Sequence, residues 1–228
     1  MWLRHQGHND EALVSAQRAL GIGIALGDVG LQVTANSFLA ELYLWVLNDY
    51  RQAAEAYRRN VEILHGALLR ERFGTTNMQS VVARAQVARC LAELGAFAEG
   101  RAYAEDALRL AETVDHPYSF VVACDGVGHF FLRQGAVSRA IHVFERALTL
   151  RETVNLPPIF RRCHVGLGAA YALSGRVTEA LPLLERGLEV PQPPGIWSQA
   201  ALFPVWLGEG YVLAGRLEEA MQLGEQAL

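Results

Sequence analysis

The sequence contains no lysine, and all 20 of its basic residues are arginine. This absence excludes Schiff-base chemistry and a Walker phosphate loop, because both need a lysine side chain. The formal net charge is −4, and no basic block or tail occurs. The electrostatic footprint of a nucleic-acid-binding protein is therefore missing, and we expect no nucleic-acid partner.

Cysteine is scarce as well. Cys90, Cys124 and Cys163 are odd in number and widely spaced, with no Cys-x-x-Cys pair among them. This spacing does not indicate a zinc site or a disulfide framework, and we expect small buried side chains in a reducing compartment. The seven histidines form no His-Glu-x-x-His motif. We therefore expect no metal ion and no cofactor.

Long apolar runs are also absent. Residues 1–7 contain no apolar signal core, and no apolar stretch reaches the roughly 20 residues that cross a membrane. Hydrophobic residues make up 51% of the chain and charged residues 19%, a balance that argues against disorder. We expect a cytoplasmic protein with no membrane partner.

What the sequence does contain is a repeat. A turn residue is followed by polar residues, then alanine, and then a stretch that mostly ends in Ala-Leu or Gly-Leu. The turn residues are Gly7, Asn48, Gly95, Gly135, Gly175 and Gly215. The differences between successive turn positions are 41, 47, 40, 40 and 40. Three successive equal intervals are hard to obtain by chance, so the chain is expected to be built of repeated units.

A second motif precedes three of these turns. It reads Val127-Gly128-x-x-Phe131, Leu167-Gly168-x-x-Tyr171 and Leu207-Gly208-x-x-Tyr211. A small residue lets the second helix of a pair approach the first, the aromatic ring fills the space beside it, and the turn glycine ends the first helix. This pattern resembles that of tetratricopeptide repeats. We expect Gly128, Gly168 and Gly208 each to face a neighbouring helix at close range.

The resemblance implies an all-α fold, a right-handed α-solenoid of helix-turn-helix pairs with long repeats of about 40 residues, against the usual 34. One superhelix is expected over residues 1–228, with a partial repeat at 1–27 and further repeats at about 28–75, 76–115, 116–155, 156–194 and 195–228. Residues 69–77 are expected to extend a helix and add a longer loop, and Pro204 to bend a helix. Because both ends fall inside helices and solenoids need capping repeats, the chain is expected to be a piece of a longer protein.

Shorter phrases carry a more specific resemblance. They are Arg-Glu-Arg-Phe-Gly at 70–74, Cys-Leu-Ala-Glu-Leu-Gly at 90–95, Asp-His-Pro-Tyr-Ser at 115–119 and Tyr-Ala-Leu-Ser-Gly-Arg at 171–176. They are similar to the C-terminal tetratricopeptide arrays of bacterial multidomain signalling proteins, in which an adenylate or guanylate cyclase domain or a DNA-binding regulator, plus an ATPase module, precedes the repeats. The resemblance implies an interaction or sensor array for signal transduction, and the cyclase and ATPase residues themselves are not in this sequence.

Candidate catalytic motifs are weak. Gly126-x-Gly128 has Phe131 where a nucleotide fingerprint needs its last glycine, and it lies within a predicted helix instead of after a strand. Asp125 and His129 are four residues apart on one helical face but lack a third metal ligand at a recognisable spacing, so a salt-linked or solvated pair is favoured. No Gly-x-Ser-x-Gly elbow occurs. We expect no enzymatic activity.

The predicted binding face is the concave surface, which the first helix of each pair lines. Trp45 and Glu41 are expected to line it in the early part of the chain. The partner-binding residues expected on it are Arg89, Asp125, His129, Arg133, Arg162, Val165, Leu173, Val205, Glu209 and Val212. Two interpretations of the arginines stay open: they pair with Glu93 and Asp125 on neighbouring helices, or they grip an acidic anchor of a partner above an apolar floor. The second interpretation predicts that Arg89→Ala with Arg133→Ala weakens partner binding and leaves folding intact.

Two functions from different classes follow. The first is a protein-interaction scaffold that holds a peptide or partner segment in the groove, which includes the case of another domain of the same parent protein. The second is a regulatory sensor array that binds a small effector and controls a linked ATPase or cyclase domain. A closed pocket under the concave face would favour the sensor array, and an open apolar groove would favour the scaffold.

Overall fold

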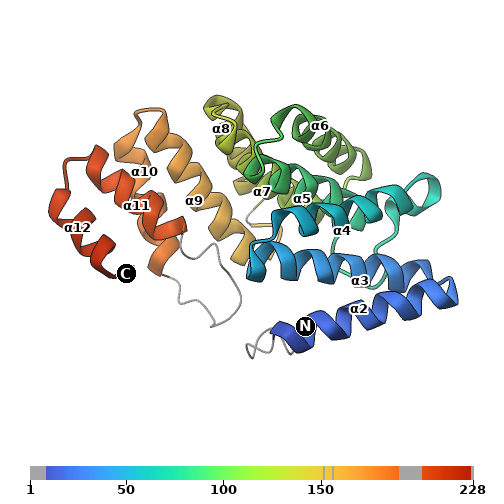
Figure 1. The fold of residues 1–228 in the computed structure, drawn as a ribbon. Helices are drawn as coiled ribbons and strands as arrows, with labels where there is room; N and C mark the ends of the chain where they lie inside the picture. The colour runs from blue at the N-terminus through green and yellow to red at the C-terminus, as the bar shows by residue number, and fades with distance from the viewer. Residues whose placement is uncertain (1–8, 151, 156, 190–201, 227–228) are drawn as a thin grey trace.

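The structure, a computed structural model, describes residues 9–150, 152–155, 157–189 and 202–226. Every regular element within these ranges is a helix, and the helices follow one another in an arc (Figure 1). The second helices α6, α8 and α10 lie along the outer side of the arc, and the first helices α7, α9 and α11 lie inside it. The expected fold class, an all-α right-handed solenoid of helix pairs, is confirmed.

Five helix pairs follow a single leading helix in the described residues. The helices are α2 (Asn9–Leu26), α3 (Val29–Leu42) with its π-helical end η1 (Tyr43–Leu47), α4 (Tyr50–Ile63), the 3-10 helix η2 (Gly66–Arg70), α5 (Gln79–Glu93), α6 (Phe97–Val114), α7 (Pro117–Arg133), α8 (Val137–Leu148), α9 (Pro157–Leu173), α10 (Val177–Glu189), α11 (Leu202–Leu213) and α12 (Leu217–Gln226). Each first helix packs on the second helix of its own pair and on the first helix of the next pair.

The turn inside each pair has one geometry. Gly95, Gly135, Gly175 and Gly215 all adopt a positive φ of 73° to 83°, and Asn48 takes this place in the first pair with φ 54°. At Gly175, the amide of Arg176 donates to the carbonyl of Tyr171 over 2.9 Å, which caps the first helix. These turns confirm the predicted positions, whereas Gly7 lies outside the described residues.

One local prediction was wrong. No helix extends into residues 71–77: α4 ends at Ile63, Gly66 adopts φ 56°, and the short η2 precedes an irregular loop. A backbone that turns at Gly66 breaks the α-helical hydrogen-bond ladder, so only the longer loop is confirmed. Pro204 is the third residue of α11 as described, and the bend expected there stays a prediction.

The motif glycines differ in their surroundings. A Cβ atom on Gly168 would lie 2.8 Å from Cγ of Leu184 and 3.1 Å from the carbonyl oxygen of Ala180, and one on Gly128 would overlap the ring of Phe144. A Cβ atom on Gly208 would meet only Leu223, at an ordinary 3.9 Å. Close approach is therefore confirmed at Gly128 and Gly168 and wrong at Gly208, because the last pair is packed less tightly there.

This difference supplies a matched pair of variants. Gly168→Leu should lower the free energy of unfolding by about 1–3 kcal/mol, since a side chain there must displace Leu184 and a backbone carbonyl. Gly208→Leu changes the same motif position in open surroundings and should cost less than about 1 kcal/mol. Urea unfolding followed by circular dichroism measures both, and equal losses would contradict the packing described here.

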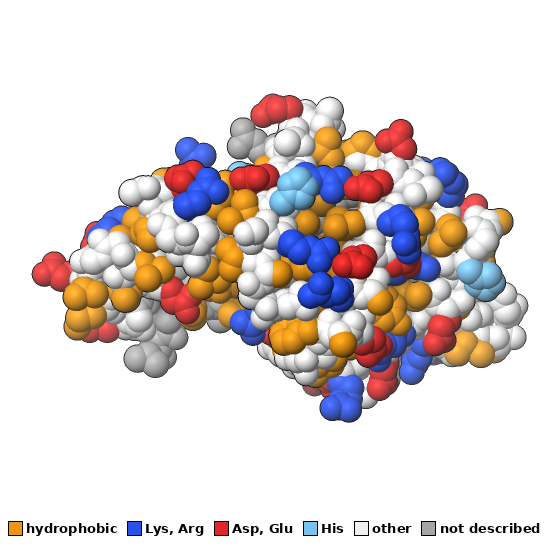
Figure 2. Space-filling view, turned by 90° about the horizontal axis from the view of Figure 1, so that it is seen from above, with side chains coloured by type: hydrophobic (Ala, Val, Ile, Leu, Met, Phe, Trp, Pro, Cys, Tyr) orange, Lys and Arg blue, Asp and Glu red, His pale blue; other side chains and the backbone are white. Residues whose placement is uncertain are grey.

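The outer surface is covered by interspersed charges (Figure 2). Several join the second helices of successive pairs: Arg58 contacts Glu99 over 2.7 Å, and Arg146 contacts Glu112 over 2.6 Å. Such exposed pairs contribute little individually, but they hold the helix pairs in one register. In the described part of the chain, no helix is long and apolar enough to cross a membrane.

Candidate partner-binding face

Equivalent positions of the first helices recur at the repeat interval that separates Gly95 from Gly135, so their side chains lie in rows across the inner side of the arc. The predicted site residues occupy these rows on α5, α7, α9 and α11. The structure separates them into two groups. Arg89, Asp125, His129, Arg162 and Val165 are buried, whereas Arg133, Leu173, Val205, Glu209 and Val212 are exposed.

A buried ion cluster occupies the centre of the inner face. Asp125 accepts from Nε and Nη2 of Arg162 over 2.9 and 2.8 Å, and its carboxylate also lies 3.4 Å from Nη1 of Arg89. Both guanidinium groups lie over the ring of Trp45, at 4.7 Å for Arg89 and 5.0 Å for Arg162. Arg89 is 2% exposed and Arg162 is 8% exposed. The cluster therefore ties the first described pair to the second, third and fourth.

A second set of polar contacts adjoins this cluster. Nε2 of His129 lies 2.5 Å from Glu93, whose other oxygen accepts from Arg133 over 2.7 Å. Nδ1 of His129 lies 3.5 Å from Nη2 of Arg89. Since a guanidinium only donates, Nδ1 is the acceptor and Nε2 carries the proton that is donated to Glu93. This network fixes both the ring orientation and the tautomer of His129.

The pKa values of this network follow from its geometry. Burial alone would raise the pKa of Glu93, but the hydrogen bonds from His129 and Arg133 outweigh it and lower the pKa to about 2. Burial, reinforced by the charge of Arg89, lowers the pKa of His129 to about 4. His129 is therefore neutral at pH 7. Asp125 stays ionised, since Arg162 and Arg89 overcome the effect of burial and lower its pKa.

The buried group corrects part of the sequence interpretation. Arg89 and Arg162 pair with Asp125, which agrees with the first interpretation of the arginines. They do not face an open groove, as the second interpretation required. Val165 is fully buried and packs against Gly187 of α10, so it does not belong to an exposed floor. The expectation that Arg89→Ala with Arg133→Ala leaves folding intact is wrong on physical grounds, because removing Arg89 takes a cation from a buried cluster.

Asp125 and His129 are not bonded to each other. Asp125 pairs with Arg162 and Arg89, and His129 contacts Glu93, while both side chains are buried, so the expected salt-linked or solvated pair was wrong. Within the described ranges, no group of three histidine, cysteine, aspartate or glutamate side chains is placed to hold a metal ion. Cys90, Cys124 and Cys163 are buried free thiols whose pKa values burial raises.

The exposed group includes a position that recurs along the first helices. We call Arg133, Leu173 and Leu213 the inner row, since they hold one position in three successive pairs. The side chain of Arg133 is 42% exposed despite its contact with Glu93, and Leu173 and Leu213 are 61% and 55% exposed. The side chains at the positions next to the inner row are buried in the interior pairs. They are exposed only in the last pair, at Val205, Glu209 and Val212.

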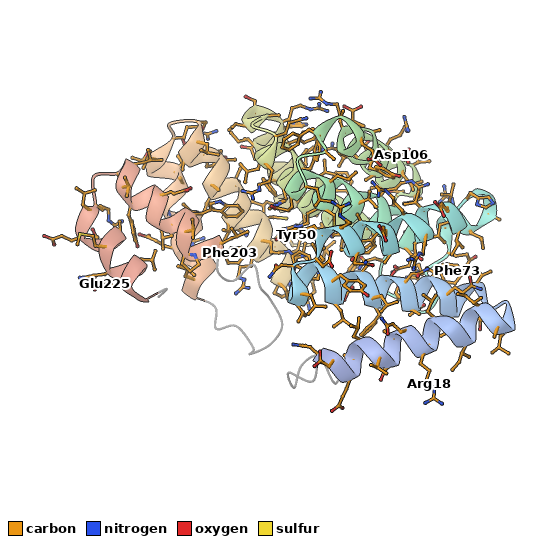
Figure 3. All side chains as sticks on the ribbon, viewed as in Figure 1. Arg18, Tyr50, Phe73, Asp106, Phe203 and Glu225 are labelled. Atoms are coloured by element: carbon orange, nitrogen blue, oxygen red, sulfur yellow. The ribbon has the colours of Figure 1, made fainter. Side chains whose placement is uncertain are left out.

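The sequence interpretation missed several residues of this face. Trp206 of α11 reaches back to His129 of α7, with ring centroids 6.3 Å apart. Phe203, labelled in Figure 3, stacks on Trp206. The central guanidinium carbon of Arg161 lies over the Phe203 ring, 5.3 Å from the ring centroid. Leu217 and Met221 of α12 are exposed apolar residues that were not proposed. The sequence feature that could have identified these four residues is the repeat interval, which places each of them at a defined position of the last helix pair.

Comparisons with known proteins agree with this architecture. Residues 123–158 match the model of the tetratricopeptide repeat family. BtubC (BKLC) from P. vanneervenii superimposes with a TM-score of 0.66 at 19% identity over 96% of this chain and 89% of that one. A Rap protein complexed with Competence and Sporulation Factor gives 0.71 at 16% identity over 100% of this chain, which spans 62% of the Rap chain. A putative kinesin light chain of Podosopora anserina with nearly identical TPR-like repeats gives 0.59 at 20% identity over 86% and 92% of the two chains.

No curated protein sequence matches the chain. At such low sequence identities, the similar structures establish the fold alone. The helix pairs and their capped turns have the fold of a tetratricopeptide-repeat solenoid, and one segment matches the model of that family.

Proposed function

We propose that this tetratricopeptide-repeat solenoid is a non-catalytic scaffold that holds a protein or peptide segment along its inner row and the adjoining open face of α11. The repeat fold in general presents extended concave surfaces to protein partners. The observation that carries the proposal is the inner row. Arg133, Leu173 and Leu213 stay exposed in three successive pairs, although the positions around them are buried in the interior pairs.

The chemistry of the inner row and the adjoining face of α11 suits a peptide with both apolar and acidic groups. Leu173, Val205 and Val212 offer apolar surface, while Arg133 supplies a partly exposed guanidinium at one end. A carboxylate on the partner can take a charge-assisted hydrogen bond from Arg133, as Glu93 already does. We therefore keep the proposal that an acidic group of the partner is bound by an arginine. The arginine is now Arg133, because Arg89 and Arg162 are buried.

The comparisons add support of a limited kind. The similar Rap structure is a complex with Competence and Sporulation Factor, which is a property of that protein. By analogy, we extend peptide binding to this chain. The short phrases similar to bacterial signalling arrays extend the proposal further, to a cytoplasmic signalling context in which the partner is a separate protein or another domain of the same parent protein.

The sensor-array alternative has less support. Its expected feature was a closed pocket under the concave face, but the centre of that face is filled by Trp45, Arg89, Asp125 and Arg162. Two pockets in the described residues border α2, one against α3 and one against α3, η1 and α4, and neither lies against the ion cluster. The geometry therefore favours the scaffold.

Site-specific photocrosslinking tests the scaffold proposal. A benzoylphenylalanine in place of Leu173 should crosslink a protein partner in cells that express the chain, because this side chain stands in the middle of the inner row. The same amino acid in place of Arg109, which is 74% exposed on α6, serves as the control. The captured partner is then purified, and its affinity for the chain is measured by isothermal titration calorimetry.

The affinity measurement decides the outcome. Leu173→Arg combined with Arg133→Glu should weaken binding of that partner at least about tenfold, through lost burial and reversed charge. Both residues are exposed, but Arg133 also contacts the buried side chain of Glu93, so Arg133→Gln with Leu173→Arg serves as the variant without a charge reversal, and circular dichroism checks that both variants are folded. Equal capture through position 109, or unchanged affinity of the double variant, would rule out the inner row as the binding surface.

A further inference from the structure

A cavity of about 380 Å³ lies between α2 and α4 and shares no residue with the inner row. α3 passes between these two helices (Figure 1) and contributes Tyr43 to the lining of the cavity. Ile24 of α2 and Ala56 of α4 supply apolar surface, while Gln17 and Arg59 supply polar groups. None of the described residues that line it is acidic. A cavity of this size can hold a small ligand.

Tyr43 holds the position of the motif aromatic residue but meets different groups. Its carbonyl accepts the amide hydrogen bond that closes the turn after α3, as the carbonyl of Tyr171 does after α9, both over 2.9 Å. The hydroxyl of Tyr171 donates to Glu145 of the preceding second helix over 2.7 Å. At the same spacing from Tyr43 the sequence has Gln17, and within the described part of the chain the Tyr43 hydroxyl has no hydrogen-bond partner. The π-helical η1 also begins at Tyr43, and such distortions are frequent at functional sites.

Arg59 lacks the acidic residue that its equivalent on a later helix meets. Counted from the turn of each pair, Arg59 of α4 corresponds to Arg146 of α8, and Ile24 of α2 corresponds to Glu112 of α6. Arg146 contacts Glu112 over 2.6 Å across the groove between α6 and α8. Arg59 and Ile24 line the cavity instead, and Arg59 forms no ion pair with any described residue. The α2–α4 groove therefore keeps hydrogen-bond donors of the later grooves and lacks their carboxylates.

Ala56 leaves the space that a larger side chain takes elsewhere. The residues at its position in the next three second helices are Tyr103, Val143 and Leu183. All three pack with the hydrophobic core, and Ala56 is the smallest of the four. The α6–α8 groove is bridged by ion pairs between those two helices alone, so the opening between α2 and α4 comes from their own side chains.

We propose that this cavity binds a small organic acid with an apolar body. The carboxylate of the acid accepts hydrogen bonds from Tyr43 and Arg59, and the apolar part lies against Ile24 and Ala56. A carboxylate is the matching group, because carboxylates of Glu112 and Glu145 meet the equivalent arginine and tyrosine in later pairs, and a guanidinium binds it with charge-assisted bonds. This site goes beyond the scaffold function and does not depend on it.

A titration with 3-phenylpropionate tests the site, since this probe joins a carboxylate to an apolar ring. Added to the ¹⁵N-labelled chain, it should shift amide resonances around Tyr43, Ala56 and Arg59, with a dissociation constant of about 1 mM for a ligand this small. The neutral 3-phenylpropionamide has nearly the same shape and should bind at least about fivefold more weakly. Acetate, which lacks the apolar body, should leave these resonances unshifted at the same concentration.

Variants of the chain test the two proposed donors. Arg59→Gln and Tyr43→Phe should each weaken binding of 3-phenylpropionate at least about threefold, because each removes a hydrogen bond to the carboxylate. Arg51→Gln is the matched control, since Arg51 is exposed on α4 as Arg59 is but does not line the cavity. Ile24→Glu places a carboxylate where Glu112 stands in the later groove, so it should compete with the probe for Arg59. Ile24→Gln loses the same apolar side chain without adding charge and should bind more tightly than Ile24→Glu.

Three results would overturn the inference, provided that the amide spectrum of each variant is that of a folded chain. They are the absence of shifts at ten times the expected dissociation constant, equal binding of 3-phenylpropionamide, and unchanged binding by both Arg59→Gln and Tyr43→Phe. Shifts confined to Arg133 and Leu173 would also overturn it while leaving the scaffold proposal in place. Conversely, loss of the crosslink through Leu173 would remove the scaffold surface without affecting this titration.

Discussion

Replacing Asp125 by alanine is expected to lower the free energy of unfolding by about 3–5 kcal/mol, because breaking a buried ion pair leaves uncompensated charge. Asp125 is the carboxylate that Arg162 and Arg89 share, and both guanidinium groups are almost fully removed from water. Trp45 interacts with both cations but carries no negative charge to replace the carboxylate. Guanidinium chloride unfolding followed by circular dichroism would measure the loss.

The control for this prediction is Arg133→Ala. Arg133 also forms an ion pair, but its side chain is 42% exposed, so its removal should cost no more than about 1 kcal/mol. A double-mutant cycle with Asp125→Ala and Arg162→Ala should show strong coupling, since the two substitutions remove the two partners of one buried ion pair. If Asp125→Ala were as mild as Arg133→Ala, the cluster would have to be open to water, contrary to the structure.

The turns of this fold could be predicted from sequence because they depend on local chemistry. Gly175 needs only its own backbone freedom and the short segment from Tyr171 to Arg176 that caps the helix. The repeat interval then placed the remaining turns. The loop after α4 was predicted less well, since residues 64–78 connect α4 and α5 within the longest turn-to-turn interval and do not share its length with the connections after α6 and α8.

The candidate site could be predicted only in part, for a different reason. Equivalent positions identify which side chains face inward, but not whether the arc leaves them open. Trp45 and Arg162 are far apart in the sequence and meet because the curvature brings the first described pair to the fourth. Two plausible pairings of Asp125 were visible in the sequence, whereas the contact of Trp45 with both of its arginine partners depends on this long-range closure.

The glycines give a similar lesson about context. Gly168 and Gly208 occupy the same motif, and the motif alone predicts close approach at both. The structure differs because Gly168 faces Leu184 and the backbone of Ala180, whereas Gly208 faces only the end of Leu223. The second helix supplies the bulk at this contact, and no pattern within the first helix encodes it. A repeat motif therefore predicts which way a residue faces more reliably than it predicts which atoms surround that residue.

The buried histidine makes stability depend on pH below neutrality. His129 has a pKa of about 4 in the folded chain against an ordinary 6.5, because burial and the charge of Arg89 disfavour the protonated ring. As the pH falls below 6.5, the unfolded chain takes up a proton that the folded chain does not bind, so the folded state loses stability. At about 1.4 kcal/mol for each pH unit down to about 4, this loss amounts to about 3 kcal/mol. The depressed pKa of Glu93 acts in the same direction but only below about pH 4.5.

The measurement is a series of urea unfolding curves between pH 7 and pH 4. The wild-type free energy of unfolding should fall over this range, and His129→Gln should make the fall shallower, because glutamine keeps polar atoms near Glu93 and does not titrate. His142→Gln is the matched control, since His142 lies exposed on α8 and its replacement should preserve the wild-type slope. His129→Gln should also lower the free energy of unfolding at pH 7. The test is therefore how steeply this free energy changes with pH, and not its value at one pH. If His129→Gln and wild type lost stability in parallel, proton uptake by His129 would not be the cause, and the Glu93–His129–Arg89 contacts would need a different protonation state from the one deduced above.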